Sequence, residues 1–118
     1  MKYAMLIYQD ENALSESERA ECSEESAQYA RELDSEGRYL AAVPLHSTAA
    51  ATTVRLQQNK RVVTDGPFAE TREQLGGLFL VEAKDLDEAI EIAGRIPAGR
   101  WGTVEIRPVV EVPGLPEN

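Results

Sequence analysis

The chain has 118 residues, of which 42% are hydrophobic and 28% are charged, so it is long enough for one domain with its own core and too short for two. Twelve basic and twenty-one acidic residues give a net charge of −9, which argues against nucleic acid or an anionic membrane as a partner, because both would repel the chain. No apolar run approaches the roughly 20 residues that a membrane-spanning helix needs.

The start of the chain predicts a buried strand at Lys2–Tyr8. This stretch is apolar on both alternating faces, with Tyr3, Met5 and Ile7 on one side and Ala4, Leu6 and Tyr8 on the other. A signal peptide would need a longer apolar core and a small-residue cleavage site, whereas an acidic stretch follows here. The single Cys22 cannot form an internal disulfide, so we expect a reducing, cytoplasmic location.

A long helix is predicted from Ser15 to about Glu36. The sequence Ser-Glu-Ser-Glu at its start has the spacing of a capping box, and Gly37 suits the left-handed position after the last turn. The predicted buried stripe consists of Ala20, Ala27, Ala30 and Leu33, with Cys22 and Tyr29 at its edge. Because this stripe is mostly alanine, we expect the helix to lie close to the surface that it covers.

Four strands are predicted in the middle of the chain. Arg38–Leu45 contains Pro44, which suits an edge strand or a strand end. Thr52–Gln57 and Arg61–Thr64 predict a hairpin around the three residues between them. Gly77–Ala83 (GLFLVEA) is again apolar on both faces.

The C-terminal part predicts a helix and a last strand. Asp85–Glu88 repeats the capping-box pattern, and Pro97 ends this helix. Its predicted buried stripe consists of Leu86, Ala89, Ile90, Ala93 and Ile96. Thr103–Val110 is the last strand, so residues 1–110 form the domain and residues 111–118 form a C-terminal tail.

The order of these elements predicts an α+β fold. Two helices cannot cover both faces of the sheet, so we expect a ferredoxin-like βαββαβ sandwich with an extra β-hairpin and with both helices on one face. Since Lys2–Tyr8 and Gly77–Ala83 are apolar on both faces, the open face would expose a large apolar patch, which a monomer seldom tolerates. The pattern therefore predicts a homodimer that pairs sheet to sheet.

The stretch VTDGPFAET places an acid in a conformationally restricted turn. Gly66 permits a positive φ, Pro67 fixes its own φ, and Phe68 can pin the turn into the core. Asp65 is therefore either a turn residue held by bonds from its side chain to the backbone, or an acid presented for chemistry.

His46, the only histidine, follows the second strand. A lone histidine is usually a surface residue, but His46 and Asp65 would lie at neighbouring strand ends if the hairpin is adjacent. A carboxylate there would fix the imidazole tautomer and raise its basicity. These two residues are the candidate catalytic pair.

The last strand supplies further candidates. Val104 and Ile106 share one face, and Glu105 and Arg107 share the other. The charged pair is either a rim ion pair or a polar lining between the sheets, where Arg107 could bind a carboxylate or phenolate. Together with Gly66, Pro67 and Phe68, they are the candidate ligand-binding residues. The sequence contains neither a metal-ligand cluster nor a glycine-rich phosphate loop, so we expect no metal and no cofactor.

Several motifs together resemble the DGPF-domain family of the YCII-related superfamily. They are TDGPFAETREQLGG, LDEAIEIAGRIP and GTVEIRPV, preceded by ATTVR and by the N-terminal MKYAMLIY. The resemblance runs from Met1 to about Val110, and it implies a ferredoxin-like fold that pairs as a dimeric α/β barrel. Most members have no assigned activity, and some are encoded beside, or fused to, extracytoplasmic-function sigma factors.

The resemblance also bears on the site. Related proteins carry a His–Asp pair proposed to act in catalysis, and at least one is a dehydrochlorinase acting on an aromatic ring. Their histidine lies on the first helix, whereas this chain has none between Ser15 and Glu36. Asp65 matches the family motif, and His46 is only a possible substitute for the missing histidine.

Two functions follow from the sequence. The first is a small-molecule-binding or regulatory protein without catalysis, which could serve a sigma-factor pathway. The second is a cofactor-independent isomerase or lyase that acts on a small organic substrate. The missing helix histidine and the absence of a metal motif favour the first.

Overall fold

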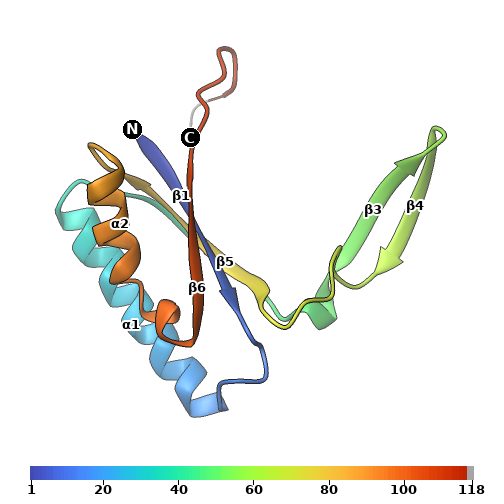
Figure 1. The fold of residues 1–118 in the computed structure, drawn as a ribbon, viewed down its shortest axis with the longest axis horizontal. Helices are drawn as coiled ribbons and strands as arrows, with labels where there is room; N and C mark the ends of the chain where they lie inside the picture. Colours follow the sequence, from blue (N-terminus) through green and yellow to red (C-terminus); the bar gives the residue numbers. More distant parts are fainter. Residues whose placement is uncertain (117–118) are drawn as a thin grey trace.

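A computed structural model describes residues 1–116, which form a sheet-and-helix body from which one β-hairpin projects (Figure 1). The elements in chain order are β1 (Lys2–Gln9), α1 (Glu16–Ser35), β2 (Tyr39–Pro44), the 3-10 turn η1 (Thr48–Ala50), β3 (Thr52–Gln57), β4 (Lys60–Asp65), β5 (Gln74–Glu82), α2 (Leu86–Gly94), the 3-10 turn η2 (Pro97–Trp101) and β6 (Gly102–Pro108). This is the predicted order, and every predicted strand overlaps an observed one. The predicted tail contains no helix or strand as far as residue 116, and residues 117–118 lie outside the described part.

The main sheet has the strand order β2-β5-β1-β6, and each neighbouring pair is antiparallel. Both helices cover one face of this sheet, which confirms the ferredoxin-like α+β fold (Figure 1). The other face, called the open face below, is not covered by any element of residues 1–116. Strand β2 lies at an edge and ends at Pro44, as the missing amide of proline requires.

The core lies between the helices and the sheet. Met5 and Val81 from the sheet are fully buried against Leu33 from α1 and Ile92 from α2. The Tyr29 hydroxyl donates to the main-chain oxygen of Ile92 at 2.8 Å, so this buried phenol has a hydrogen-bond partner. No helix in the described part of the chain is both long and apolar enough to cross a membrane.

Both predicted ends of α1 are confirmed. The Ser15 hydroxyl accepts from the Glu18 amide at 3.2 Å, and the Ser15 amide donates to the Glu18 carboxylate at 2.9 Å, which completes the capping box. Gly37 has a φ of +74°, and the Arg38 amide donates to the Leu33 oxygen at 2.9 Å. These features form a Schellman motif, which needs a left-handed residue at this position.

The predicted buried stripe of α1 was wrong in its centre. Cys22, Tyr29 and Leu33 are the buried residues of this helix, whereas Ala20 and Ala27 are exposed. The larger side chains face the sheet because they remove more apolar area from water than alanine does. Ala27 lies instead on the side of the helix where a cavity opens.

The predicted stripe of α2 was also displaced. Ala89, Ala93 and Ile96 are buried as expected, but Leu86 and Ile90 are exposed, and the omitted Ile92 takes their place in the core. The second capping box is half formed: Asp85 caps the Glu88 amide at 2.9 Å, but the Glu88 carboxylate accepts from Lys84 and not from the cap residue.

Strands β3 and β4, residues 52–65, form a separate two-stranded sheet, called the arm below. Gln58 and Asn59 both have positive φ, 50° and 66°, as a two-residue type I′ hairpin turn requires. The arm stands on the side of the main sheet opposite the helices (Figure 1). The radius of gyration is accordingly 16.0 Å, against about 13.5 Å for a compact chain of this length.

Candidate functional site

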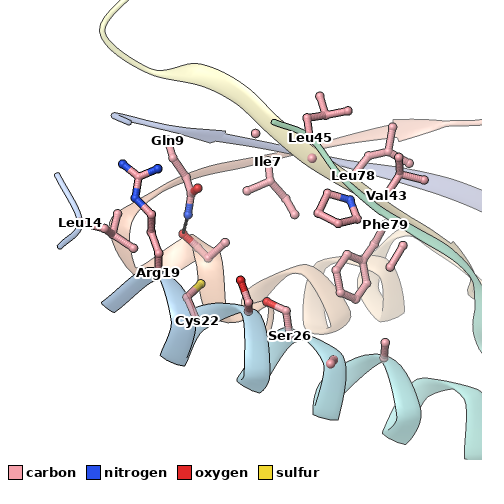
Figure 2. A pocket seen from close by; sticks show the side chains of 18 of the residues that line it. Ile7, Gln9, Leu14, Arg19, Cys22, Ser26, Val43, Leu45, Leu78 and Phe79 are labelled. Atoms are coloured by element: carbon pink, nitrogen blue, oxygen red, sulfur yellow. Dashed lines mark hydrogen bonds between the residues drawn. The ribbon is translucent and has the colours of Figure 1, made fainter. Parts of the chain in front are cut away.

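A cavity of about 520 Å³ lies between α1 and the β2 side of the main sheet (Figure 2). Its volume is in the range of pockets that hold small organic molecules. The walls come from one side of α1 and from the ends of β1, β2 and β5.

The cavity exists because small residues face each other across this gap. Helix α1 presents Ser23, Ser26 and Ala27, and strand β5 presents Gly76 and Gly77. The large side chains of α1 that fill the core lie on a neighbouring side of the helix. A side chain at position 77 would also come within 2.9 Å of the main-chain oxygen of Val43, so glycine is required for the close approach of β2 to β5.

The polar and charged side chains gather toward one end of the cavity. Figure 2 shows Gln9, Arg19 and Cys22 at that end, with Leu14 beside them, and the ring of Phe79 at the other end. A ligand that fits both ends has an apolar body and one polar or charged group.

Arg19 is the cationic residue of the cavity lining. One of its guanidinium nitrogens donates to the main-chain oxygen of Glu11, which holds the side chain near the cavity. Within residues 1–116, no carboxylate forms an ion pair with Arg19. Its remaining N–H groups are therefore available to an anionic ligand.

Cys22 lies in the floor of the cavity and is almost completely buried. Burial raises the pKa of its thiol above the usual value, so the residue is a neutral thiol at pH 7 and a weak nucleophile. We interpret it as a packing residue that borders the cavity.

The carboxylate of Glu11 accepts hydrogen bonds from Ser47 and Thr48, in the segment between β2 and β3. It accepts from the Thr48 amide at 2.7 Å, from the Thr48 hydroxyl at 3.0 Å and from the Ser47 hydroxyl at 3.1 Å. The bond from the Thr48 amide is the main reason that the pKa of Glu11 is below its usual value. This contact ties the root of the arm to the segment after β1, and no local pattern in the sequence indicates it.

The candidate catalytic pair lies outside the cavity. His46 and Asp65 are both exposed, and no hydrogen bond or ion pair joins their side chains among the residues that the structure describes. His46 directly follows Leu45, which lines the cavity, while Asp65 pairs with Thr52 at the root of the arm. Their catalytic pairing stays a prediction.

The Asp-Gly-Pro-Phe turn is held by its backbone. Gly66 has a φ of +105°, its amide donates to the Ala51 oxygen at 2.8 Å, and its oxygen accepts from the Thr53 hydroxyl at 2.7 Å. Glycine is needed here because other residues are strained at this φ.

Phe68 does not pin the turn into the core, which corrects the expectation from the sequence. Its side chain is 75% exposed, and the Arg55 guanidinium lies over the ring, 5.2 Å from its centre. The turn lies at the root of the arm, where the core of the same chain does not reach.

Glu105 and Arg107 lie on the open face, because their neighbours Val104 and Ile106 pack toward the helices. The two side chains approach to 3.7 Å, and the Tyr8 hydroxyl donates to the Glu105 carboxylate at 3.2 Å. Partial burial and the Glu105 charge raise the pKa of Tyr8, which therefore remains a phenol at neutral pH.

None of the seven residues singled out from the sequence lines the cavity. These residues are His46, Asp65, Gly66, Pro67, Phe68, Glu105 and Arg107. Arg19, Ser23 and Ser26 were missed, because on the sequence they read as the ordinary polar residues of a solvated helix.

Two comparisons with known proteins bear on identity. The family model of the YCII-related domain matches residues 1–113. An uncharacterized protein of Rhizobium meliloti (strain 1021) is 36% identical, and the match covers 92% of this chain and 92% of that protein. Neither name states an activity.

Proposed function

The chain belongs to the YCII-related domain family, and we propose that this member binds a small organic acid in the cavity between α1 and the sheet. The observation that carries this proposal is that one cavity has an apolar end and an end with Arg19, which forms no ion pair within residues 1–116. The protein would then act as a binding or regulatory protein, and an association with a sigma factor is one setting for such a role.

The walls define the class of ligand. Phe79 and Ala42, which pair across β5 and β2 on the helix side of the sheet, can bury an apolar ring or a branched chain, and the planar guanidinium of Arg19 matches a carboxylate. The hydroxyls of Ser23 and Ser26 lie between these ends and can orient a further polar group. A polyphosphate is disfavoured, because one cation in a chain of net charge −9 offers too little positive potential.

Binding without catalysis is favoured by what lines the cavity. Among the described residues, the lining includes no histidine and no carboxylate, and its one thiol is held neutral by burial. General acid–base catalysis needs a titratable group within hydrogen-bond reach of the substrate. The cavity can therefore hold a ligand more readily than transform it.

A direct test uses a panel of monocyclic aromatic and branched aliphatic carboxylates, each paired with its primary amide, in calorimetric titrations. We expect carboxylates to bind more tightly than the amides. Arg19→Gln should weaken carboxylate binding about tenfold or more, the size of a lost charge-assisted hydrogen bond. Arg31→Gln, on the same helix but outside the cavity, is the matched control and should bind normally.

The single thiol gives a second readout. A ligand in the cavity should slow alkylation of Cys22 by iodoacetamide, as followed by mass spectrometry. Equal affinity for acids and amides, or unchanged binding by Arg19→Gln, would overturn the proposal.

We also propose that the chain forms a homodimer through its open face. Leu6 pairs across the ladder with Leu78, and Ala4 pairs with Leu80, so these four apolar side chains share a partly exposed surface in the centre of the sheet. Covering this surface with a second copy removes it from water. Sedimentation at micromolar concentration should give twice the 13.0 kDa chain mass, and Leu80→Lys should shift the protein to the monomer.

The alternative function is a cofactor-independent isomerase or lyase, and the contact of Tyr8 with Glu105 beside Arg107 supports it. In the proposed dimer this group would be enclosed, with Glu105 as the base and Arg107 as the anion-binding group. Enzyme action predicts solvent deuterium incorporation or new NMR resonances when the carboxylate panel is incubated with the protein. Glu105→Gln should then abolish the reaction and leave cavity binding intact, because Glu105 lies outside the cavity lining.

A further inference from the structure

The arm has one apolar face that its own chain leaves bare. Val54 pairs directly with Val63 across the hairpin, and Leu56 lies two residues along on the same face. These three side chains are 57%, 58% and 78% exposed, respectively. Arg61 pairs directly with Leu56 and so lies on the same face, while the opposite face carries Arg55, whose guanidinium lies over Phe68.

The arm needs a surface to pack against. A two-stranded hairpin is marginally stable in water unless a further strand or layer covers it. The turn of this hairpin adds little, because Gln58 and Asn59 adopt positive φ without the glycine that favours it. Strands β3 and β4 pack chiefly against each other, so the body of the same chain does not supply the covering layer.

The charge of the arm indicates what covers it. The arm carries three cationic side chains, Arg55, Lys60 and Arg61, and one carboxylate, Asp65, a net charge of +2. Because the whole chain has a net charge of −9, the residues outside the arm carry a net charge of −11. A basic arm with an apolar face is complementary to the acidic body of a second copy of this chain.

The geometry allows such a contact. The arm and the helices stand on opposite sides of the main sheet (Figure 1), so a second body seated on the open face lies on the side to which the arm extends. In a dimer with two-fold symmetry, each arm has the same position relative to the other copy, so each arm reaches the body of the other copy.

We propose that each arm packs its Val54, Leu56 and Val63 face against the second copy and clasps it. The clasp rests on the open-face dimer proposed above. It also gives the Asp-Gly-Pro-Phe turn a mechanical role. The backbone bonds of Gly66 to Ala51 and Thr53 set the direction of the arm, and the bonds from Ser47 and Thr48 to Glu11 fix its root.

Adjacent residues on opposite faces of the arm provide the test. Leu56→Lys places a charge on the bare face, and Gln57→Lys places the same charge on the other face. We expect Leu56→Lys to weaken dimerisation at least tenfold in sedimentation equilibrium, while Gln57→Lys stays within about twofold of the wild type. Equal dimerisation by the two variants would overturn the clasp and leave the open-face dimer standing.

Hydrogen exchange gives an independent measurement. In the wild-type dimer the ladder amides of β3 and β4 should be protected, and in the monomer produced by Leu80→Lys they should exchange much faster. The core amides of β1 and β5 report whether that variant is folded. Arm protection that persists in a folded monomer would show that the arm needs no second copy. A wild-type protein that stays monomeric would remove the dimer and the clasp together, and leave cavity binding to be judged by its own titration.

Discussion

The body and the arm are built from the same kind of strand, but their apolar side chains are buried in the body and exposed in the arm. β1 and β5 alternate apolar side chains that are buried under two helices, while β3 and β4 place valine and leucine in solvent. A β-strand pattern therefore predicts a strand in both places, but it does not predict which layer covers that strand. In the body the layer comes from the same chain; in the arm we infer that it comes from another.

The difference between body and arm should be largest when one leucine from each region is replaced by alanine and the loss of unfolding free energy is compared. Leu33 is fully buried and Leu56 is 78% exposed. Leu33→Ala should lower the free energy of unfolding by about 2–5 kcal/mol through lost burial and a new cavity. Leu56→Ala should change it by less than about 0.5 kcal/mol when both are measured by urea unfolding in the monomeric Leu80→Lys background. A comparable loss from Leu56→Ala would mean that the arm packs on its own chain.

Replacing a glycine by alanine should lower the free energy of unfolding in both regions, but for different physical reasons. Gly77→Ala forces a side chain to within 2.9 Å of the Val43 oxygen, so β2 must move, at about 1–3 kcal/mol. Gly66→Ala meets no atom within 4 Å and is strained only by its φ of +105°, which costs about 1–3 kcal/mol.

The readouts separate the two glycines even where the magnitudes overlap. Gly77→Ala should also reduce ligand binding, because position 77 lines the cavity. Gly66→Ala should leave binding unchanged and alter the dimer. Reversed effects on binding and dimerisation would contradict the division of roles between the two regions.

Much of the fold was predictable because its signals are local. Residues within a few positions of each other determine the capping box at Ser15, the glycine after α1 and the hairpin turn. Because residues 1–116 contain only two α-helices, these helices can cover only one face of the sheet. The rotation of both helix stripes was not predictable, because residues at the edge of an apolar arc are placed by the neighbouring layer. The exposed Phe68 shows the same limit: sequence identifies an apolar residue and does not say which body covers it.

The cavity and the Glu11 contact depend on residues far apart in the chain. Gly77 and Ser23 are unremarkable separately, and they form a cavity only because β5 and α1 bring small residues together. Glu11 lies 37 residues from Thr48, a separation at which no sequence periodicity links a carboxylate to its donors. This contact joins the body to the arm, so its removal tests how firmly the two regions are connected.

Glu11 should make the connection sensitive to acid. Because its pKa in the folded protein is below the usual 4.5, the ionised carboxylate stabilises the fold at pH values above 4.5, and this contribution is lost as the pH falls through the folded pKa. Glu11→Gln should therefore show a smaller loss of unfolding free energy between pH 7 and pH 3 than the wild type. Faster exchange of the Thr48 amide in Glu11→Gln would locate the effect at the arm root, and an unchanged pH dependence would contradict it.

The smallest expected effect concerns two tyrosines, one on each face of the main sheet. Burial is the main cause that raises the pKa of both. The carboxylate of Glu105 raises the pKa of Tyr8 further, whereas the carboxylates that raise the pKa of Tyr29 are those of Glu36 and Glu32. Glu105→Gln should therefore lower the pKa of Tyr8, since the phenolate no longer faces a negative charge, and it should leave the pKa of Tyr29 unchanged. Titration of labelled tyrosine rings by NMR separates the two residues.

The same titration also tests the dimer. A second sheet over the open face would bury Tyr8 more deeply, so dilution to the monomer should lower the pKa of Tyr8, while the pKa of Tyr29, which is already inside the body, should not change. A pKa of Tyr8 that is insensitive to both Glu105→Gln and dilution would mean that the open face is neither electrostatically coupled as described nor covered by a second copy.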